Sequence, residues 1–175
     1  MLILGIDPGP QTHGAAIYDS ERRRVVWSDK AIASDELLRT VSEFQRTDRW
    51  LDAVVIERPA AMGTLGPGIV GHMLDTSWEG GHLSAVLQEC LHEVVHTMTR
   101  RQVLRSLGVL SGKGSPDSKV RAACIADHTV PGGPPAVGKK ASPGPLYGVS
   151  SHAWQALGLI LAWLEVEQNN GDTND

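Results

Sequence analysis

Five short apolar runs, each bounded by turn residues, are the first feature of the sequence. Runs of this length and with such boundaries are typical of β-strands. The polar stretch at residues 19–22 separates the second run from the third, which predicts a hairpin, so the chain is expected to begin as a three-stranded meander. The fourth run stops at Arg58-Pro59 and is too short for a helix, so we interpret it as a buried strand. The five runs cover residues 2–6, 12–18, 24–27, 51–57 and 93–97.

Helical spacing of apolar residues falls between and after these runs. Residues 34–44 begin with a serine suited to N-capping and place Leu37, Leu38, Val41 and Phe44 on one face, the pattern of an amphipathic helix. The same reasoning predicts helices over residues 83–91, 100–107, 118–128 and 150–166. The last of these is apolar on nearly all sides, so we expect it to lie against the sheet.

Three segments lack regular spacing. Residues 60–71 are rich in glycine and predict a flexible loop. Residues 129–149 contain 10 Gly or Pro among 21 residues and predict a long loop. Residues 167–175 are polar, and we expect them to form a flexible tail. The chain of 175 residues is therefore predicted to form a single domain over residues 1–166.

Composition narrows the class of protein. Apolar residues make up 41% of the chain and charged residues 21%, which is enough apolar material for a globular core. The sequence has neither an uncharged apolar run of about 18 residues nor a basic, cleavable start, so we expect no membrane partner, no secretion and a cytoplasmic location. Cys90 and Cys124 are too few for a disulfide framework or a zinc site, and we expect both to be core residues.

Charge is distributed unevenly along the chain, although the whole carries a net charge of only −4. Residues 98–149 contain eight Lys or Arg against two Asp or Glu. A basic segment of this size attracts a polyanion if it folds onto one face, whereas the alternative is an ordinary solvated surface. The candidate DNA-binding residues in this segment are Arg100, Arg101, Lys113, Lys119, Arg121, Lys139 and Lys140.

Three polar residues occupy positions where burial is expected. Asp7 ends the first strand, Glu57 ends the fourth, and His152 lies in the first turn of the last helix. If the two strands are neighbours, the two carboxylates lie side by side and repel each other unless a divalent cation or a proton separates them. The pattern therefore indicates a metal site, although each residue taken alone is more typical of a cap or a salt bridge.

Three segments carry a resemblance to a known family. The order and spacing of three stretches of the chain resemble the signature segments of the RuvC family of Holliday-junction resolvases: residues 5–17 (GIDPGPQTHGAAI), 54–59 (VVIERP) and 151–158 (SHAWQALG). The sequence of residues 143–154 resembles phage-type members more than the cellular enzymes. The resemblance implies an α/β, RNase H-like fold with a five-stranded mixed sheet flanked by helices. It also implies a metal-dependent endonuclease that cleaves branched DNA as a homodimer.

The resemblance assigns roles residue by residue. Asp7 and Glu57 match the family's metal-binding carboxylates, and His152 stands where the family has Asp or sometimes His. Gln155 departs from the pattern, because most members have a further Asp there. The implied cofactors are two Mg²⁺ or Mn²⁺ ions per site, which here have fewer anionic ligands than usual. We expect the other candidate ligands, His82 and His96, to be structural.

Further expectations concern the loop, the dimer surface and the alternative functions. The loop at residues 60–71 corresponds to one that enters the junction centre, with Ala60, Ala61 and Met62 in place of a large aromatic wedge. Residues 83–91 are a candidate dimer surface, with core packing as the alternative. The leading alternative function is a catalytically weak or inactive branched-DNA-binding module of the same fold, which the Gln155 departure favours. An actin-like ATPase needs two such domains, so the chain length excludes it.

Overall fold

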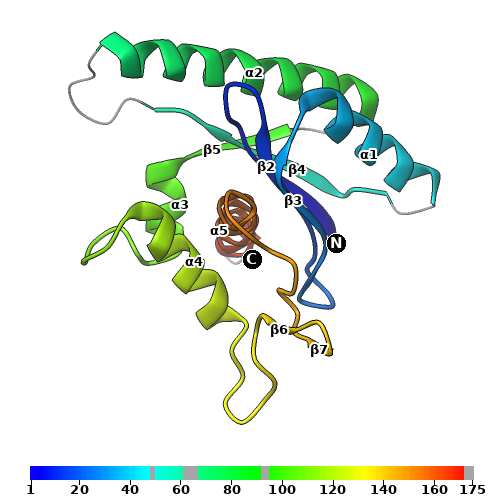
Figure 1. The fold of residues 1–175 in the computed structure, drawn as a ribbon, viewed down its shortest axis with the longest axis vertical. Coiled ribbons are helices and arrows are strands. Elements are labelled where there is room, and N and C mark those ends of the chain that lie inside the picture. Colours follow the sequence, from blue (N-terminus) through cyan, green and yellow to red (C-terminus); the bar gives the residue numbers. More distant parts are fainter. Residues whose placement is uncertain (48–49, 61–66, 92–94, 172–175) are drawn as a thin grey trace.

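A five-stranded mixed sheet forms the centre of the molecule in the computed structural model, which describes residues 1–47, 50–60, 67–91 and 95–171 (Figure 1). The strands lie in the order β3-β2-β1-β4-β5. The first three form the predicted antiparallel meander, and β4 and β5 continue the sheet parallel to β1. Their bounds are β1 Leu2–Asp7, β2 His13–Asp19, β3 Arg24–Ile32, β4 Ala53–Arg58 and β5 Val95–Thr99. The predicted mixed sheet is confirmed.

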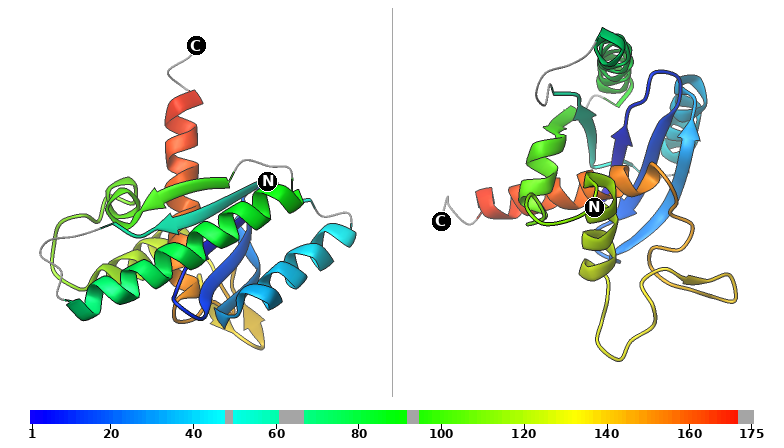
Figure 2. Two further views of the ribbon diagram at one scale, coloured as in Figure 1. Left: turned by 90° about the horizontal axis from the view of Figure 1, so that it is seen from above. Right: turned by 60° about the vertical axis from the view of Figure 1, so that its left-hand side comes forward.

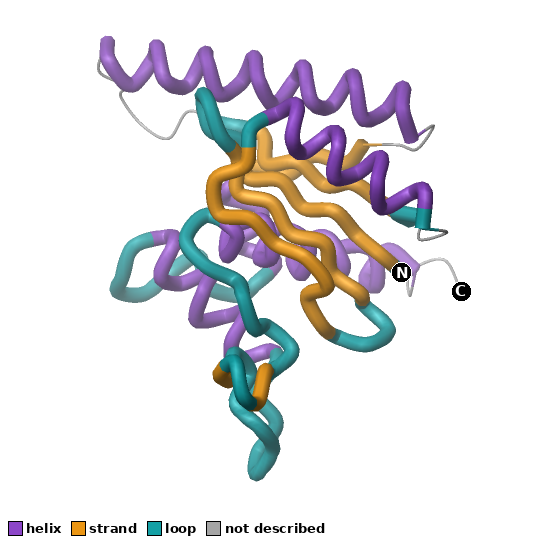
Figure 3. Tube along the Cα trace, turned by 45° about the vertical axis from the view of Figure 1, so that its right-hand side comes forward, coloured by secondary structure: helices purple, strands orange, loops and turns teal. Residues whose placement is uncertain are grey.

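Helices cover both faces of the sheet (Figures 2 and 3). α1 (Ser34–Arg46) and α2 (Pro67–Leu91) lie on one face, where their apolar side chains pack with Leu4, Ile6 and Ile56 of the sheet. α3 (Arg100–Ser106), α4 (Pro116–Asp127) and α5 (Ala153–Gly171) lie on the other. α5 packs directly on the sheet, as predicted. No helix in these described segments is long and apolar enough to cross a membrane.

α5 approaches the sheet closely because β1 carries a glycine beneath it. A Cβ atom on Gly5 would collide with the carbonyl oxygen of Ala156 and would lie 2.7 Å from Cγ1 of Ile160. Only glycine leaves room for the helix at this position. The close contact matters for function because Gln155 lies in the first turn of α5, and His152 lies immediately before the helix rather than in its first turn as predicted.

Two predictions about residues 83–91 are corrected. Leu83, Leu87 and Leu91 are buried in the core beneath α2, so this apolar face is not available as a dimer surface. Cys124 is buried as expected, whereas Cys90 is exposed. The reason is helical geometry: residues four apart share a face, and the three leucines occupy the inner face of α2.

Several element bounds also differ from prediction. α2 begins at Pro67, a residue well suited to the first helical turn, so the predicted loop at 60–71 ends there; residues 61–66 lie outside the described part of the chain. The segment 129–149 contains a short hairpin formed by β6 (Gly138–Lys139) and β7 (Ser142–Pro143). α5 continues to Gly171, beyond the predicted end at residue 166, and 172–175 are not described.

Candidate active site

The two candidate carboxylates lie at the ends of adjacent parallel strands. Ile6 of β1 pairs with Ile56 of β4, so the next residues, Asp7 and Glu57, emerge at the same edge of the sheet. The side chain of each is only 11% exposed. Strand register therefore brings together two acidic groups that are 50 residues apart in the sequence, as predicted from the apolar runs that precede them.

A single guanidinium group lies against both carboxylates. Nη2 of Arg100 is 3.5 Å from Oδ1 of Asp7, and Nε of Arg100 is 3.1 Å from Oε1 of Glu57. Nη1 donates a hydrogen bond to Oε1 of Gln155 and lies 4.0 Å from Oδ1 of Asp117. The Arg100 side chain is 20% exposed. Sequence reasoning placed Arg100 among residues that contact DNA, and the structure places it between the two carboxylates.

Local structure determines where Arg100 points. β5 ends at Thr99, which pairs with Arg58 one residue beyond Glu57, and α3 begins at the next residue. Thr99 accepts a hydrogen bond from the backbone of Gln102, and the Gln102 side chain accepts one from the backbone of Thr99, which is a capping box. The pattern Thr-x-x-Gln directly after a strand was the sequence signal that places Arg100 at the carboxyl end of the sheet.

His152 and Gln155 reach the same cluster from the start of α5. Nδ1 of His152 lies 3.3 Å from Oδ2 of Asp7, and the His152 side chain is 64% exposed. Gln155 is buried, and its side chain bridges Arg100 and the backbone carbonyl of Asp117, the latter at 3.5 Å. The three-residue spacing predicted that these two side chains would face one site, and both of them adjoin the carboxylate cluster.

Burial controls the electrostatics of the carboxylates. It raises the pKa of Asp7 above its usual value, and the nearby Arg100 and His152 oppose that rise. Burial raises the pKa of Glu57 to about 7, with Arg100 lowering it and Asp7 raising it further. Oε2 of Glu57 is buried and accepts no hydrogen bond from the described residues. Even with Arg100 in place, the site therefore favours an additional proton or cation.

The side chains present fit a hard divalent cation in their chemistry. Two carboxylates and one amide supply oxygen ligands, which Mg²⁺ and Mn²⁺ prefer, and the unpartnered Oε2 of Glu57 is a free ligand atom. In the described ranges, however, no group of three or more His, Cys, Asp and Glu is arranged to hold a metal ion. The donors are present, but the guanidinium of Arg100 lies among them.

Two cavities meet at Arg100. One of about 280 Å³ is lined by Asp7, Asp117 and His152, and the other, of about 800 Å³, is lined by Glu57, Arg101 and Lys119 among others. Arg100 lines both cavities. The larger one combines a carboxylate with basic side chains, so it can accept a phosphate group close to Glu57.

The predicted DNA-binding residues do not form one patch. Arg101 and Lys119 lie beside Glu57, whereas Lys139 and Lys140 belong to the hairpin near the far end of α4 (Figure 1). The guanidinium of Arg121 lies 5.5 Å from the centre of the Trp154 ring, and Lys113 is exposed in the loop between α3 and α4. His82 is exposed and the His96 ring contacts Trp163, and neither residue lines the two cavities at Arg100.

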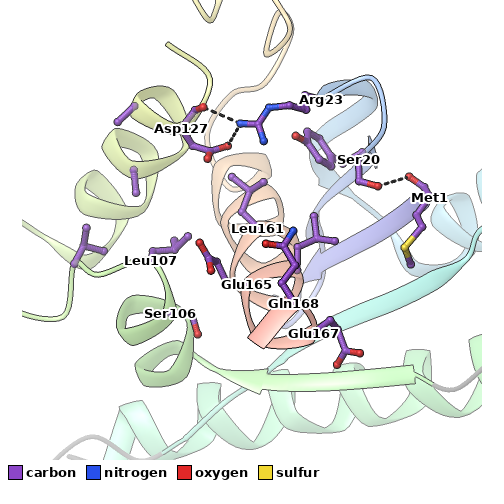
Figure 4. Close-up of a pocket in the computed structure, with 15 residues that line it drawn as sticks. Met1, Ser20, Arg23, Ser106, Leu107, Asp127, Leu161, Glu165, Glu167 and Gln168 are labelled. Atoms are coloured by element: carbon purple, nitrogen blue, oxygen red, sulfur yellow. Dashed lines mark hydrogen bonds and ion pairs between the residues drawn. The ribbon is translucent and has the colours of Figure 1, made fainter. Parts of the chain in front are cut away.

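A further cavity of about 760 Å³ lies between α4, α5 and the N-terminal residues (Figure 4). Arg23 reaches across it to Asp127, with Nη2 and Oδ2 2.9 Å apart. Glu165 and Glu167 also line this cavity, so its acidic side chains outnumber the basic one. That balance disfavours a nucleic-acid ligand there, and we place the candidate active site at the Asp7–Glu57 cluster.

Comparison with solved structures shows where this fold occurs. RuvC from Thermus thermophilus, solved in complex with a Holliday junction substrate, matches with a TM-score of 0.60 and 17% sequence identity over 96% of this chain and 95% of that one. A second T. thermophilus RuvC structure matches with a TM-score of 0.56 and 18% identity over 97% of each chain. No protein-family model matches the sequence, and a search of curated proteins finds no match either. The chain thus has the RNase H-like fold of RuvC over nearly its whole length.

Proposed function

We propose that the protein is a metal-dependent endonuclease that cleaves branched DNA, including Holliday junctions, by phosphodiester hydrolysis. The observation that carries this proposal is the pair of largely buried carboxylates, Asp7 and Glu57, each with an 11% exposed side chain, at adjacent strand ends beside a cavity lined by Arg101 and Lys119. The fold shared with a protein solved on a Holliday junction supports the class of substrate.

Different residues of the chain would bind the metal and the DNA. Asp7 and Glu57, with His152 and Gln155 beside them, would hold Mg²⁺ or Mn²⁺. When bound, such a cation lowers the pKa of an attacking water and stabilises the leaving oxygen. His152 lies at the solvent-exposed side of Asp7, where an incoming backbone would pass. Arg101 and Lys119 bind phosphates and position the strand, since such contacts set register rather than sequence preference.

The proposed assembly is a homodimer, because symmetric cleavage of a two-fold junction needs two active sites related by a two-fold axis. Because Leu83, Leu87 and Leu91 are buried, the support comes from the outer side of α2. Leu74 and Trp78 are 60% and 77% exposed, and their spacing of four residues places them on one face of the helix. Large exposed apolar side chains grouped in this way are typical of contact surfaces.

A cleavage assay tests the proposed activity. The purified protein is incubated with a labelled mobile four-way junction, a flap, a duplex and an RNA–DNA hybrid, each with Mg²⁺ or Mn²⁺. We expect cleavage of the branched substrates, and loss of that cleavage in Asp7→Asn and Glu57→Gln with junction binding retained. Glu43→Gln removes an exposed carboxylate of α1 and serves as the matched control. Cleavage by Asp7→Asn at the wild-type rate would place the active site elsewhere.

The alternative is a branched-DNA-binding module without nuclease activity. Two features of the site favour this alternative. Gln155 is neutral where most members of the RuvC family have an aspartate, and Arg100, which donates a hydrogen bond to Gln155, adds a positive charge at the carboxylates. The same assay separates the two functions. Binding of the junction without cleavage under either metal supports the binding module and contradicts the nuclease.

A further inference from the structure

The Arg100 guanidinium occupies the position that a cation bound to both carboxylates would need. It contacts one oxygen of Asp7 and one of Glu57, at 3.5 and 3.1 Å. We propose that Arg100 is an internal competitor of the divalent cation, which sets the affinity of the site for metal and must leave the carboxylates before metal binds. This inference rests on the proposed function in one respect, namely that Asp7 and Glu57 are the metal ligands.

Geometry supports competition rather than coexistence. The guanidinium lines both cavities at the site, with Asp7 and His152 on one and Glu57 on the other. With Arg100 between them, the acidic side chains do not converge on one point, in keeping with the lack of a three-residue metal cluster in the described part of the chain. Moving the guanidinium would leave the two carboxylates facing each other directly.

Electrostatics supports the same conclusion. A guanidinium and a divalent cation at the same carboxylates repel each other, and little water is present to screen them because both acidic side chains are only 11% exposed. Without metal, Arg100 compensates the negative charge of the two carboxylates. With metal bound, the ion compensates that charge and Arg100 is not required. Removing the charge of Arg100 therefore destabilises the metal-free protein and favours the metal-bound one.

Arg100 has a place to move. It is the first residue of α3, its side chain is 20% exposed, and the cavity of about 800 Å³ lies beside it with Arg101 and Lys119 on the wall. On the other side, Nη1 donates a hydrogen bond to the neutral Gln155, and the only opposing charge there among the described residues is Asp117, which is 65% exposed and 4.0 Å away. A guanidinium displaced into that cavity would join the two cations that we propose contact DNA phosphates.

Direct measurement of metal binding without DNA tests this inference. Mn²⁺ is titrated into wild-type protein, Arg100→Met, Arg100→Lys and Arg105→Met at pH 8, and free Mn²⁺ is followed by electron paramagnetic resonance. Arg100→Met keeps an apolar stem but removes the charge, and Arg105→Met makes the same change at an exposed arginine of α3 that lines neither cavity at the site. We expect Arg100→Met to bind Mn²⁺ at least about tenfold more tightly than wild type, Arg100→Lys to fall between them, and Arg105→Met to match wild type.

Two further measurements locate and support the effect. Asp7→Asn in the Arg100→Met background should abolish the gain, which places the ion at the carboxylates. Metal-free Arg100→Met should melt at a lower temperature than wild type, and saturating Mn²⁺ should raise its melting temperature by more than it raises that of wild type. If Arg100→Met fails to fold without metal, Arg100→Lys carries the test, since an ammonium group cannot reproduce the fork that spans both carboxylates.

The outcomes separate this inference from the proposed function. Asp7-dependent Mn²⁺ binding by wild type, with equal or weaker binding by the Arg100 variants, overturns the role of Arg100 and leaves the nuclease proposal intact. Absence of Mn²⁺ binding in wild type but tight binding in Arg100→Met supports the inference in its strongest form. Absence of binding in every variant overturns both.

Discussion

Gly14 lies directly beneath His152. A Cβ atom on Gly14 would come within 2.5 Å of the carbonyl carbon and oxygen of His152, and Gly14 is also the cross-strand partner of Asp7 in the β1–β2 ladder. One glycine thus lets the start of α5 rest on the sheet immediately beside the first carboxylate. The 3.3 Å approach of His152 Nδ1 to Asp7 Oδ2 depends on this contact.

Gly14→Ala should displace the first turn of α5. The clash is with backbone atoms, which cannot rotate away, so we expect a loss of roughly 1–3 kcal/mol in the free energy of unfolding and at least about a tenfold loss of cleavage. Urea denaturation and the junction cleavage rate measure the two effects. Gly81→Ala, at an exposed position of α2 where an added Cβ meets open space, should instead be neutral or stabilising. Wild-type cleavage by Gly14→Ala would show that the position of His152 is unimportant.

His152→Ala should separate chemistry from stability. The side chain is 64% exposed, so its removal should change the free energy of unfolding by less than about 0.5 kcal/mol. Its nitrogen lies beside Asp7, so we expect at least about a tenfold loss of cleavage with Mn²⁺ or Mg²⁺. His82→Ala, at an exposed histidine of α2, should retain wild-type cleavage. An active His152→Ala variant would leave Asp7 and Glu57 as the only required ligands.

Glu57 should make the metal-free protein less stable as the pH rises. Burial raises its pKa to about 7 in the folded protein, against about 4.3 for an unfolded chain. The folded state then holds the proton more tightly, so the stabilising contribution is complete below about pH 4.3 and is lost as the pH rises toward 7. Between about pH 5 and about pH 8, wild type should lose on the order of 2 kcal/mol more stability than Glu57→Gln.

Urea denaturation of both proteins in a metal chelator measures this difference. Glu43→Gln, which alters an exposed carboxylate on α1, should follow the wild-type pH dependence. The comparison between variants matters because buried His13 and His128, whose pKa values are lowered by burial, contribute a trend of the opposite sign in every protein. Parallel curves for wild type and Glu57→Gln would contradict the raised pKa.

DNA affinity should depend more on the cations beside the site than on those of the hairpin. Replacing Arg101 and Lys119 with Ala should weaken binding to all DNA substrates and reduce the slope of log affinity against log salt by about 0.9 for each lost phosphate contact. The Lys139 and Lys140 double variant tests the hairpin in the same way, and Lys30→Ala, on the opposite edge strand β3, is the control. An unchanged slope in the first variant would remove these residues from the interface.

Local patterns in the sequence were sufficient to predict the strands and to identify the acidic residues at the ends of two of them. Asp7 and Glu57 could be selected because each polar residue follows a buried apolar run, and the parallel pairing of β1 with β4 brings them to one edge. Element bounds were less predictable. Residues 67–71 contain two glycines that suggest a loop, yet they are helical, because they extend a helix that packs on the sheet through Leu83, Leu87 and Leu91, and an existing helix propagates readily.

Arg100 shows the limit of sequence reasoning. In the sequence it is one of eight cations in a basic segment, and charge alone does not separate it from its neighbour Arg101. The capping box that starts α3 directs the first side chain toward the sheet edge and leaves the second exposed. Its ion pair with Asp7 spans 93 residues and its hydrogen bond to Gln155 spans 55, so neither follows from local periodicity.

The sequence by itself determined the apolar spacing that forms the sheet and its helices, and the acidic residues that end β1 and β4. Those features depend on interactions between residues close in the chain, or on a periodicity that any buried strand must have. Only the tertiary structure decided that the guanidinium of Arg100 lies between the two carboxylates. That arrangement depends on strand register, on the close packing of α5 over Gly5 and Gly14, and on the burial that makes an unpaired charge costly, which arise only when distant segments pack together.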